Sequence, residues 1–322
     1  MGIKNKGALI ISLDFELLWG VFDKVNYKEK EIYFNNTKKV IPEILNLFSE
    51  YKIHCTWATV GMLFNADWTE WKTNLPENLP NYKNQSLSAF KYGNSISDLG
   101  TEEFCFAKEL IKRIQNTSNQ EIATHTYSHY YCLEKGQNLQ SFEADIKQCI
   151  KLAKQLGVDL KSLVFPRNQF NEEYLKVCHE NGIENVRSNP TNWYWSDVQN
   201  DTLKSKIFRT GDAYIGINDK SYSHSKLVRE RGKPLSQKAS RLLRPYSSNR
   251  AINNLKLKRI MTEMTYAARN KHIYHLWWHP HNFGDNPEEN ISDLRKLLEH
   301  YKKCQEKYNF CSLTMSELNS LI

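Results

Sequence analysis

Three short segments of the chain combine carboxylates and histidines in a way that is suited to hydrolysis. Asp14 and Glu16 stand two residues apart at the end of an apolar run. His125 and His129 stand four residues apart, and His279 follows a second apolar run. One carboxylate and two imidazoles can hold a divalent metal ion and leave positions for water and substrate. A second carboxylate and a further histidine can move protons, so the set predicts metal-assisted hydrolysis of an amide or ester.

The spacing within these segments predicts which side chains share a face. Residues i and i+2 of an extended strand point to the same side, so Asp14 and Glu16 can enter one pocket. Histidines four residues apart share one face of a helical turn, which is the geometry expected for His125 and His129. Each segment alone has a structural alternative, such as a helix cap or a loop histidine. Their joint occurrence at the ends of apolar runs favours function.

Alternating strands and helices are expected to position these segments. Apolar runs predict strands at 8–13, 53–60, 120–124, 162–165, 183–187, 272–278 and 310–313. Helical spacing of apolar residues predicts helices at 38–51, 104–114, 139–156, 172–181 and 289–301. The alternation indicates parallel βα units, in which chemistry collects on the loops that follow strands. The long polar segment 66–100 is expected to pass over that functional face.

The motifs resemble those of the polysaccharide deacetylase family, also known as the NodB homology domain and related to carbohydrate esterase family 4. The family's acidic pair is matched by Asp14 and Glu16, and its H-[ST]-x-x-H motif by residues 125–129. Its histidine after an apolar strand is matched by His279. The likeness covers about residues 8–187 and 270–318. It implies an α/β fold with a distorted (β/α)7-type barrel, in one catalytic domain spanning residues 1–322.

The resemblance also implies roles for individual residues. Asp14 would be the general base, His279 the general acid, and Arg167 would pair with Asp14 and orient it. One divalent ion is expected, with zinc first and cobalt, nickel or manganese as alternatives; its implied ligands are Glu16, His125 and His129. Phe15 separates the two acids, so the sequence leaves open which of them binds metal. The residues expected to contact substrate are Trp19, Asn168, Trp278 and His281.

Charge is concentrated in one part of the chain. The 322 residues carry 44 Lys or Arg and 36 Asp or Glu, a net charge of +8. Residues 220–259 hold twelve of the basic residues and one acid, so the rest of the chain is net negative at −3. This segment is interpreted as a basic insert: either a solvated arm or a docking element for phosphates on a nucleotide sugar, a lipid carrier or an anionic membrane. No nucleic acid is expected, because few aromatic residues interleave with the charges.

Composition predicts the cellular setting. No stretch approaches the roughly 20 apolar residues that span a bilayer, and the first apolar run is too short for a signal peptide. The seven cysteines show no CxxC spacing and are expected to be reduced and mostly buried. We therefore expect a cytoplasmic protein with possible peripheral contact at the inner membrane face. Loop aromatics could stack on sugars or anchor loops, and the sequence leaves this open for Trp68, Trp71, Trp193, Tyr194 and Trp195.

These observations together favour one reaction. The hypothesis is a metal-dependent hydrolase that removes an N-acyl group, expected to be acetyl, from an amino sugar in the biosynthesis of a surface polysaccharide such as O-antigen or capsule. The sugar could be nucleotide-linked, lipid-linked or part of an oligosaccharide. Two alternatives remain open: an allantoinase-like cyclic-amide hydrolase, and a catalytically inactive glycan-binding domain.

Overall fold

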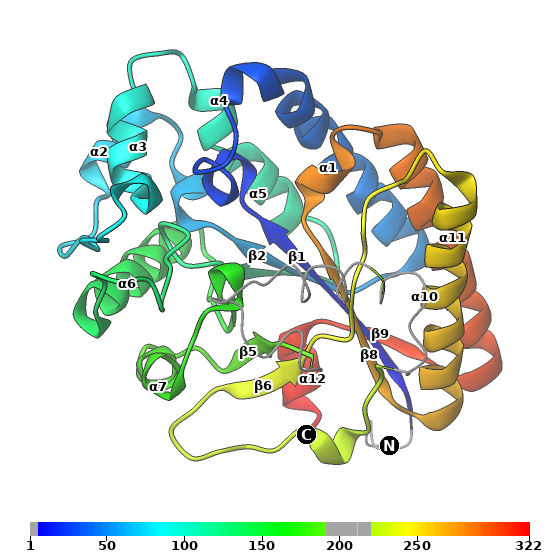
Figure 1. The fold of residues 1–322 in the computed structure, drawn as a ribbon. Helices are drawn as coiled ribbons and strands as arrows, with labels where there is room; N and C mark the ends of the chain where they lie inside the picture. The colour runs from blue at the N-terminus through cyan, green and yellow to red at the C-terminus, as the bar shows by residue number, and fades with distance from the viewer. Residues whose placement is uncertain (1–5, 191–210, 212–219) are drawn as a thin grey trace.

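A parallel sheet forms the centre of the computed structural model, which describes residues 6–190, 211 and 220–322. The strands run in the order β6-β5-β4-β3-β2-β1-β8-β7, and β9 pairs with the start of β1. The sheet curls, with helices around its outside (Figure 1). This arrangement confirms the predicted distorted barrel. The strands are β1 (Ala8–Phe15), β2 (Cys55–Thr59), β3 (Gln120–Thr124), β4 (Ser162–Val164), β5 (Asn185–Ser188), β6 (Leu235–Lys238), β7 (Arg241–Leu242), β8 (Ile273–Trp278) and β9 (Cys311–Leu313).

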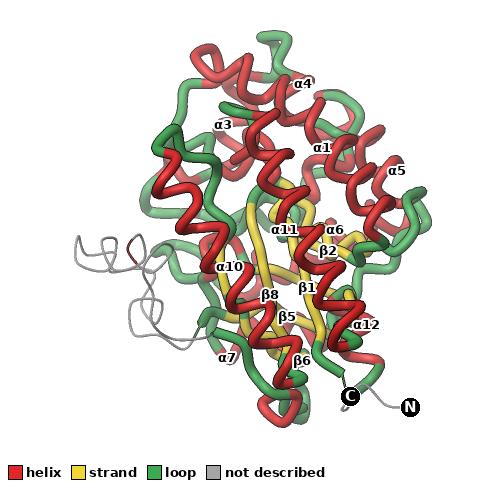
Figure 2. The backbone as a smooth tube through the Cα atoms, turned by 90° about the vertical axis from the view of Figure 1, so that its right-hand side faces the viewer, coloured by secondary structure: helices red, strands yellow, loops and turns green. Residues whose placement is uncertain are grey.

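Helices follow most of the strands and cover the sheet. The longer ones are α1 (Glu31–Tyr51), α6 (Leu139–Gln155), α10 (Arg250–Asn270) and α11 (Pro287–Tyr308). Figure 2 shows α10, α11 and α1 lying in front of the strands on one side of the molecule. No helix among the described residues is long and apolar enough to cross a membrane. The shorter helices are α2 (Trp68–Thr73), α3 (Ala89–Ile96), α4 (Glu102–Cys105), α5 (Lys108–Gln115), α7 (Glu172–Glu180) and α12 (Met315–Ser320).

Strand β1 lies between β2 and β8, and all eight of its residues are buried. Its register aligns the carboxyl ends of neighbouring strands: Phe15 pairs with Thr59, and Thr59 pairs with Thr124. Because the strands are parallel, the residues that follow them reach the same edge of the sheet. The segments after β1, β3 and β8 are the three that carry the predicted chemistry.

Most predicted elements are found within a few residues of their expected bounds. The segment 66–100 contains α2 and α3, and its two tryptophans are buried, so Trp68 and Trp71 anchor the loop rather than face a ligand. The other aromatics of this kind, Trp193, Tyr194 and Trp195, lie outside the described residues. All seven cysteines are free, and six of them are buried as expected.

Residues 220–259, expected as a basic insert, contribute elements to the fold. This segment supplies β6, which pairs with β5, β7, which pairs with β8, and the first turns of α10. Some of its charges are internal, because Arg241 pairs with Glu263 and Lys256 lies 3.5 Å from Asp293, all four residues being buried. These elements are hard to recognise in the sequence because the segment is rich in basic residues. The acidic residues that pair with its buried cations come later in the chain.

Candidate metal and hydrolase site

The acidic pair lies where β1 leaves the sheet. Asp14 is the last residue but one of β1, and Glu16 precedes a 3-10 turn over Leu17–Gly20. Both carboxylates are buried and line one cavity, as the strand spacing predicts. Gly20 is required there, because a Cβ at this position would overlap the Glu16 carboxylate. The turn therefore cradles the carboxylate at the edge of the sheet.

The histidine motif adopts a loop, not the helical turn expected from its spacing. Thr126 and His129 have positive φ angles of 62° and 55°, which reverse the chain after β3. This backbone, rather than a helix face, brings His125 and His129 together, with ring centroids 5.0 Å apart. The hydroxyl of Thr126 accepts a hydrogen bond from the amide of Tyr130 at 2.7 Å and stabilises the reversal.

A buried carboxylate from α6 fixes the middle of this loop. Asp145 accepts hydrogen bonds from the amides of Tyr127 and Ser128 at 2.6 and 3.1 Å. It also accepts one from the Ser128 hydroxyl. Satisfying backbone amides that have no partner in a strand or helix holds the loop in one conformation. Asp145 was not among the residues predicted from the sequence, although an acid on the buried side of a predicted helix is an unusual placement.

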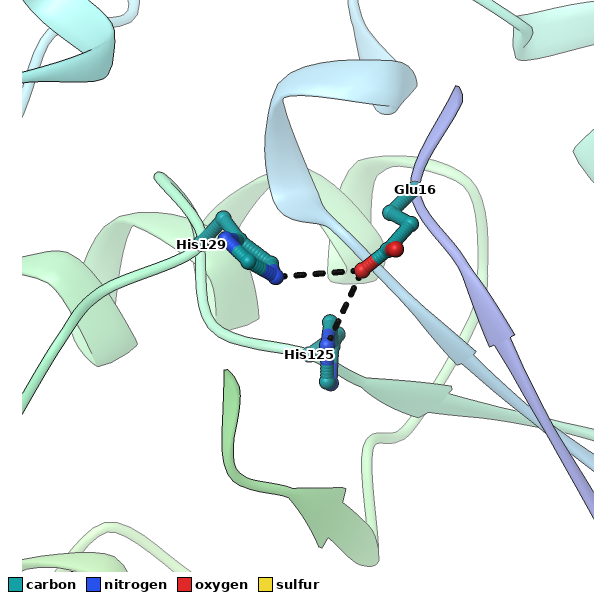
Figure 3. A group of neighbouring side chains, drawn as sticks. All are labelled: Glu16, His125 and His129. Carbon is teal, nitrogen blue, oxygen red and sulfur yellow. Dashed lines mark ion pairs between the residues drawn. The ribbon is translucent and has the colours of Figure 1, made fainter. Parts of the chain in front are cut away.

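Glu16 and the two histidines form a compact ligand set. Glu16 Oε2 lies 3.0 Å from His129 Nε2 and 3.3 Å from His125 Nε2, as Figure 3 shows. His125 Nδ1 lies 2.7 Å from the carbonyl oxygen of Val164 and must donate to it, because a carbonyl only accepts. In its neutral form the ring would then present the lone pair of Nε2 to Glu16. His129 Nδ1 lies 3.1 Å from the hydroxyl of Tyr131.

The charge state of these groups suits a cation. Burial raises the pKa of Glu16, but its interactions with His279 and His129 outweigh this effect and hold the pKa well below its usual value. Burial lowers the pKa of His129 to about 4. An ionised carboxylate and a neutral imidazole are the forms that bind metal. Glu16 Oε2 is buried and has no hydrogen-bond partner among the described residues, so these residues fit a divalent ion.

Asp14 is held by Arg187, an arginine that was not predicted from the sequence as part of the site. Arg187 of β5 donates from Nη1 and Nη2 to the two oxygens of Asp14, both at 2.7 Å. Burial raises the pKa of Asp14, but the Arg187 guanidinium, together with the nearby His125 and His279, outweighs this effect and keeps the pKa below its usual value. Arg187 is itself buried, so the pair is bidentate and shielded from water.

The expected pairing of Arg167 with Asp14 was wrong. Arg167 lies in the 3-10 turn Pro166–Asn168 with a φ of 52°, and its guanidinium pairs with Asp23. It also stacks on Tyr131, 4.2 Å from the ring centroid. The positive φ turns the side chain to the rim of the cavity, while Arg187 enters from the sheet beneath. A cation within a predicted buried strand was the signal that could have identified Arg187.

Two histidines after β8 complete the cavity. His279 Nε2 lies 3.6 Å from both Asp14 Oδ2 and Glu16 Oε1, and the side chain is 26% exposed, so it meets the two carboxylates and the solvent. His281 Nδ1 lies 3.7 Å from Glu16 Oε1, and burial lowers the pKa of this histidine to about 4. The cavity has a volume of about 330 Å³.

Of the four residues expected to contact substrate, two line the cavity and two do not. Asn168 and His281 line it. Trp19 is fully buried, and its indole N–H donates to the carbonyl of Cys105 at 2.7 Å. Trp278 is also buried and stacks on Phe283. Trp277, the residue before Trp278, lines the cavity instead, because successive residues of a strand point to opposite faces.

Comparison with known proteins identifies the family. A family model described as polysaccharide deacetylase matches residues 21–186, about half of the chain. The chain belongs to the polysaccharide deacetylase family. The match includes His125 and His129 and ends one residue before Arg187, so Asp14, Glu16 and His279 are placed by the structure alone. No curated protein sequence matches the chain.

Solved structures share the fold at low identity. The "putative polysaccharide deacetylase" from Mycobacterium smegmatis is 14% identical with a TM-score of 0.59, covering 98% of this deacetylase-family chain and 90% of that one. The "probable Polysaccharide deacetylase" from Pseudomonas aeruginosa PAO1 is 8% identical with a TM-score of 0.50 (98% and 89%). An allantoinase matches with the same identity and TM-score, covering 98% of this chain and 88% of that one. The fold alone therefore does not separate deacetylation from cyclic-amide hydrolysis.

Proposed function

We propose that the protein is a metal-dependent hydrolase that removes an N-acyl group, expected to be acetyl, from an amino sugar. One observation carries the proposal. The Nε2 atoms of His125 and His129 converge on one buried oxygen of Glu16, beside a second carboxylate, Asp14, that is already neutralised by Arg187. Two adjacent carboxylates with different partners can take different roles.

Glu16, His125 and His129 would hold the ion, for which zinc is the first expectation, since imidazole and carboxylate suit it, with cobalt, nickel and manganese as alternatives. When bound, a divalent ion supplies Lewis acidity toward the amide carbonyl and lowers the pKa of a nearby water. The contacts from His125 Nδ1 to the Val164 carbonyl and from His129 Nδ1 to Tyr131 orient the two rings. Such contacts raise the basicity of the coordinating nitrogen.

Asp14 and His279 would transfer the protons. Asp14 stays ionised beside Arg187 and accepts the proton that the attacking water loses. The two hydrogen bonds from Arg187 fix the plane of the carboxylate and leave further lone pairs for this proton. His279, the more exposed group, donates a proton to the amine nitrogen as the C–N bond breaks. Its Nε2 faces Asp14, so both proton carriers reach the same side of the cavity.

We further propose that the substrate belongs to the biosynthesis of a surface polysaccharide and is met in the cytoplasm or at the inner face of a membrane. Membership of the deacetylase family supports an acetylated carbohydrate. The net charge of +8 supports an anionic partner or surface. The pathway and the location of the substrate are more specific statements than the type of reaction, and each needs a test of its own.

The first experiment measures metal content together with acetate release. The purified protein, His125→Ala and His129→Ala are analysed for bound divalent ions, with His179→Ala as control, because His179 is an exposed histidine of α7. We expect about one ion per chain, lost in both site variants and kept in the control. Acetate release from N-acetylated amino sugars should follow the metal. An apoprotein that hydrolyses a cyclic ureide without metal would contradict the proposal and favour the allantoinase-like alternative.

A further inference from the structure

The same cavity is lined by two cations that are not acid, base or metal ligand in the proposed function. Lys24 follows the turn after β1, and Arg167 follows β4. Lys24 is exposed and forms no ion pair with any described residue. Arg167 pairs with Asp23, but its Nε has no hydrogen-bond partner in the part of the chain that the structure describes.

The charges of the cavity do not cancel. Asp14 and Glu16 are the two carboxylates among the described residues that line it. Asp14 is neutralised by Arg187 through two hydrogen bonds of 2.7 Å. Glu16 would be more than neutralised by a divalent ion, and Asp23 already neutralises Arg167. Lys24 then remains as an uncompensated positive charge at the mouth, so the loaded site attracts an anion.

The two cations differ in mobility in a way that suits recognition of an anion. The guanidinium of Arg167 is fixed by stacking on Tyr131 and by its contact with Asp23. A fixed, planar guanidinium offers several N–H donors in one orientation. Lys24 is a compact charge on a flexible stem, which can follow an anion into place. Asn168 lines the cavity next to Arg167 and adds an amide.

We propose that Lys24 and Arg167 form an anion subsite, and that the acylated amino sugar carries a phosphate ester next to the sugar ring. This inference rests on the proposed function and names its substrate class. A cavity of about 330 Å³ is near the lower limit of small-molecule pockets and suits one sugar unit with a charged substituent. The basic segment expected to bind phosphate contains buried, paired cations, whereas Lys24 faces the reaction site.

The test uses products, which bind to the metal-loaded enzyme without turnover. Calorimetry compares glucosamine 1-phosphate with glucosamine for the wild type, Lys24→Ala, Lys24→Glu and the control Lys28→Ala. Lys28 is an exposed lysine nearby that does not line the cavity. We expect the phosphate to improve binding by about tenfold or more, and most of this gain to vanish in Lys24→Ala. Lys24→Glu should reverse it, and added salt should weaken it.

Equal binding of the two products, or a phosphate preference that survives in Lys24→Glu, would overturn the subsite. Glucosaminuronic acid carries a carboxylate instead of a phosphate, and tighter binding of this compound than of the phosphate would overturn the phosphate assignment. Acetate release from N-acetylglucosamine 1-phosphate is measured in parallel. Phosphate-selective binding without any acetate release would contradict the proposed function and leave the anion subsite intact, so the two failures are distinguishable.

Discussion

Two clusters in this molecule each centre on a buried glutamate, and they differ in whether the hydrogen bonding of that glutamate is complete. On the buried face of α10, Glu263 of this helix meets Arg241, Arg259 and Tyr274. Its Oε2 accepts from Arg241 Nε at 2.6 Å and from the hydroxyl of Tyr274 at 2.8 Å. Its Oε1 accepts from Arg241 Nη2 at 2.6 Å and lies 3.0 Å from Arg259 Nη2. Both oxygens are satisfied within the protein.

At the carboxyl edge of the sheet, Glu16 is equally buried but its hydrogen bonding is incomplete. Its Oε2 has imidazole nitrogens at 3.0 and 3.3 Å and no hydrogen-bond partner among the described residues. Nitrogen and oxygen lone pairs that point at one another repel unless a cation lies between them. Burial of a carboxylate alone therefore does not indicate function here. The two clusters differ in whether the carboxylate oxygens already accept hydrogen bonds from the protein.

The largest expected contrast comes from the same substitution in both clusters. Glu16→Gln should abolish metal binding, because a neutral amide replaces the only charged ligand of the set. The metal-free protein should lose only about 1–2 kcal/mol of unfolding free energy, because the low pKa of Glu16 means that its charge is stabilised in the fold, while Gln can still donate to an imidazole nitrogen. Metal analysis and urea unfolding in a chelator measure the two effects. A Glu16→Gln protein that keeps a stoichiometric ion would break the comparison.

Glu263→Gln should do the reverse. Removing the charge takes this carboxylate away from the buried Arg241 and the partly buried Arg259, which costs about 3–5 kcal/mol of unfolding free energy. The folded fraction should bind metal as the wild type does, because Glu263 does not line the cavity. Urea unfolding and metal content of the folded protein check this. Unchanged stability would show that the cluster on the buried face of α10 is not the structural counterpart described above.

A smaller effect is expected at the glycine that cradles Glu16. In Gly20→Ala the new methyl group takes the place of the Glu16 carboxylate, which must swing away from the two histidines. We expect metal affinity to fall about 10–100-fold, as for loss of a contact that orients a ligand. Competition with a chromophoric chelator measures the affinity. The control is Gly100→Ala, whose Cβ would meet nothing within 4 Å; if both variants lose affinity equally, the cradle has no special role.

The sequence predicted the part of the site that is encoded locally. Asp14, Glu16, His125 and His129 stand beside the ends of strands whose apolar runs are easy to recognise, and parallel topology brings such ends together. Arg187 was missed because its pairing with Asp14 joins residues on β5 and β1, which are not neighbours in the sheet. Trp278 was chosen in place of Trp277 because β8 is buried on both faces and shows no alternation from which to infer direction.

The same distinction between locally encoded features and features that depend on distant residues applies to the fold. Helices and strands with strong periodicity were predicted within a few residues, as for β3 and α6. In residues 220–259 the many cations suggested exposure to solvent, and only Glu263 and Asp293, later in the chain, make Arg241 and Lys256 compatible with burial. The loop of His125 and His129 could not be derived from spacing, since its positive φ angles depend on Asp145 of α6.

The last and smallest effect concerns His275, a buried titratable group beneath the site. Its Nε2 lies 2.8 Å from the hydroxyl of Ser12, which accepts a hydrogen bond from Arg187 at 3.0 Å and can donate its own proton to the imidazole. Burial and then the charge of Arg187 lower the pKa of His275 to about 3. Between this value and the ordinary pKa of about 6.5, the unfolded chain binds a proton that the folded protein does not. Stability is therefore full above pH 6.5 and falls on acidification, by up to about 1.4 kcal/mol per pH unit from this one group.

In His275→Gln that contribution should disappear, so unfolding free energies measured in urea at pH 7, 6 and 5 should fall less steeply than in the wild type. The slope should not vanish, because burial also lowers the pKa values of His129 and His281 to about 4, with the same sign. The exposed His179→Gln serves as the matched control and should keep the wild-type slope. Parallel curves for His275→Gln and the wild type would mean that His275 is protonated in the folded protein, and the Ser12 hydroxyl would then have to accept from both His275 and Arg187.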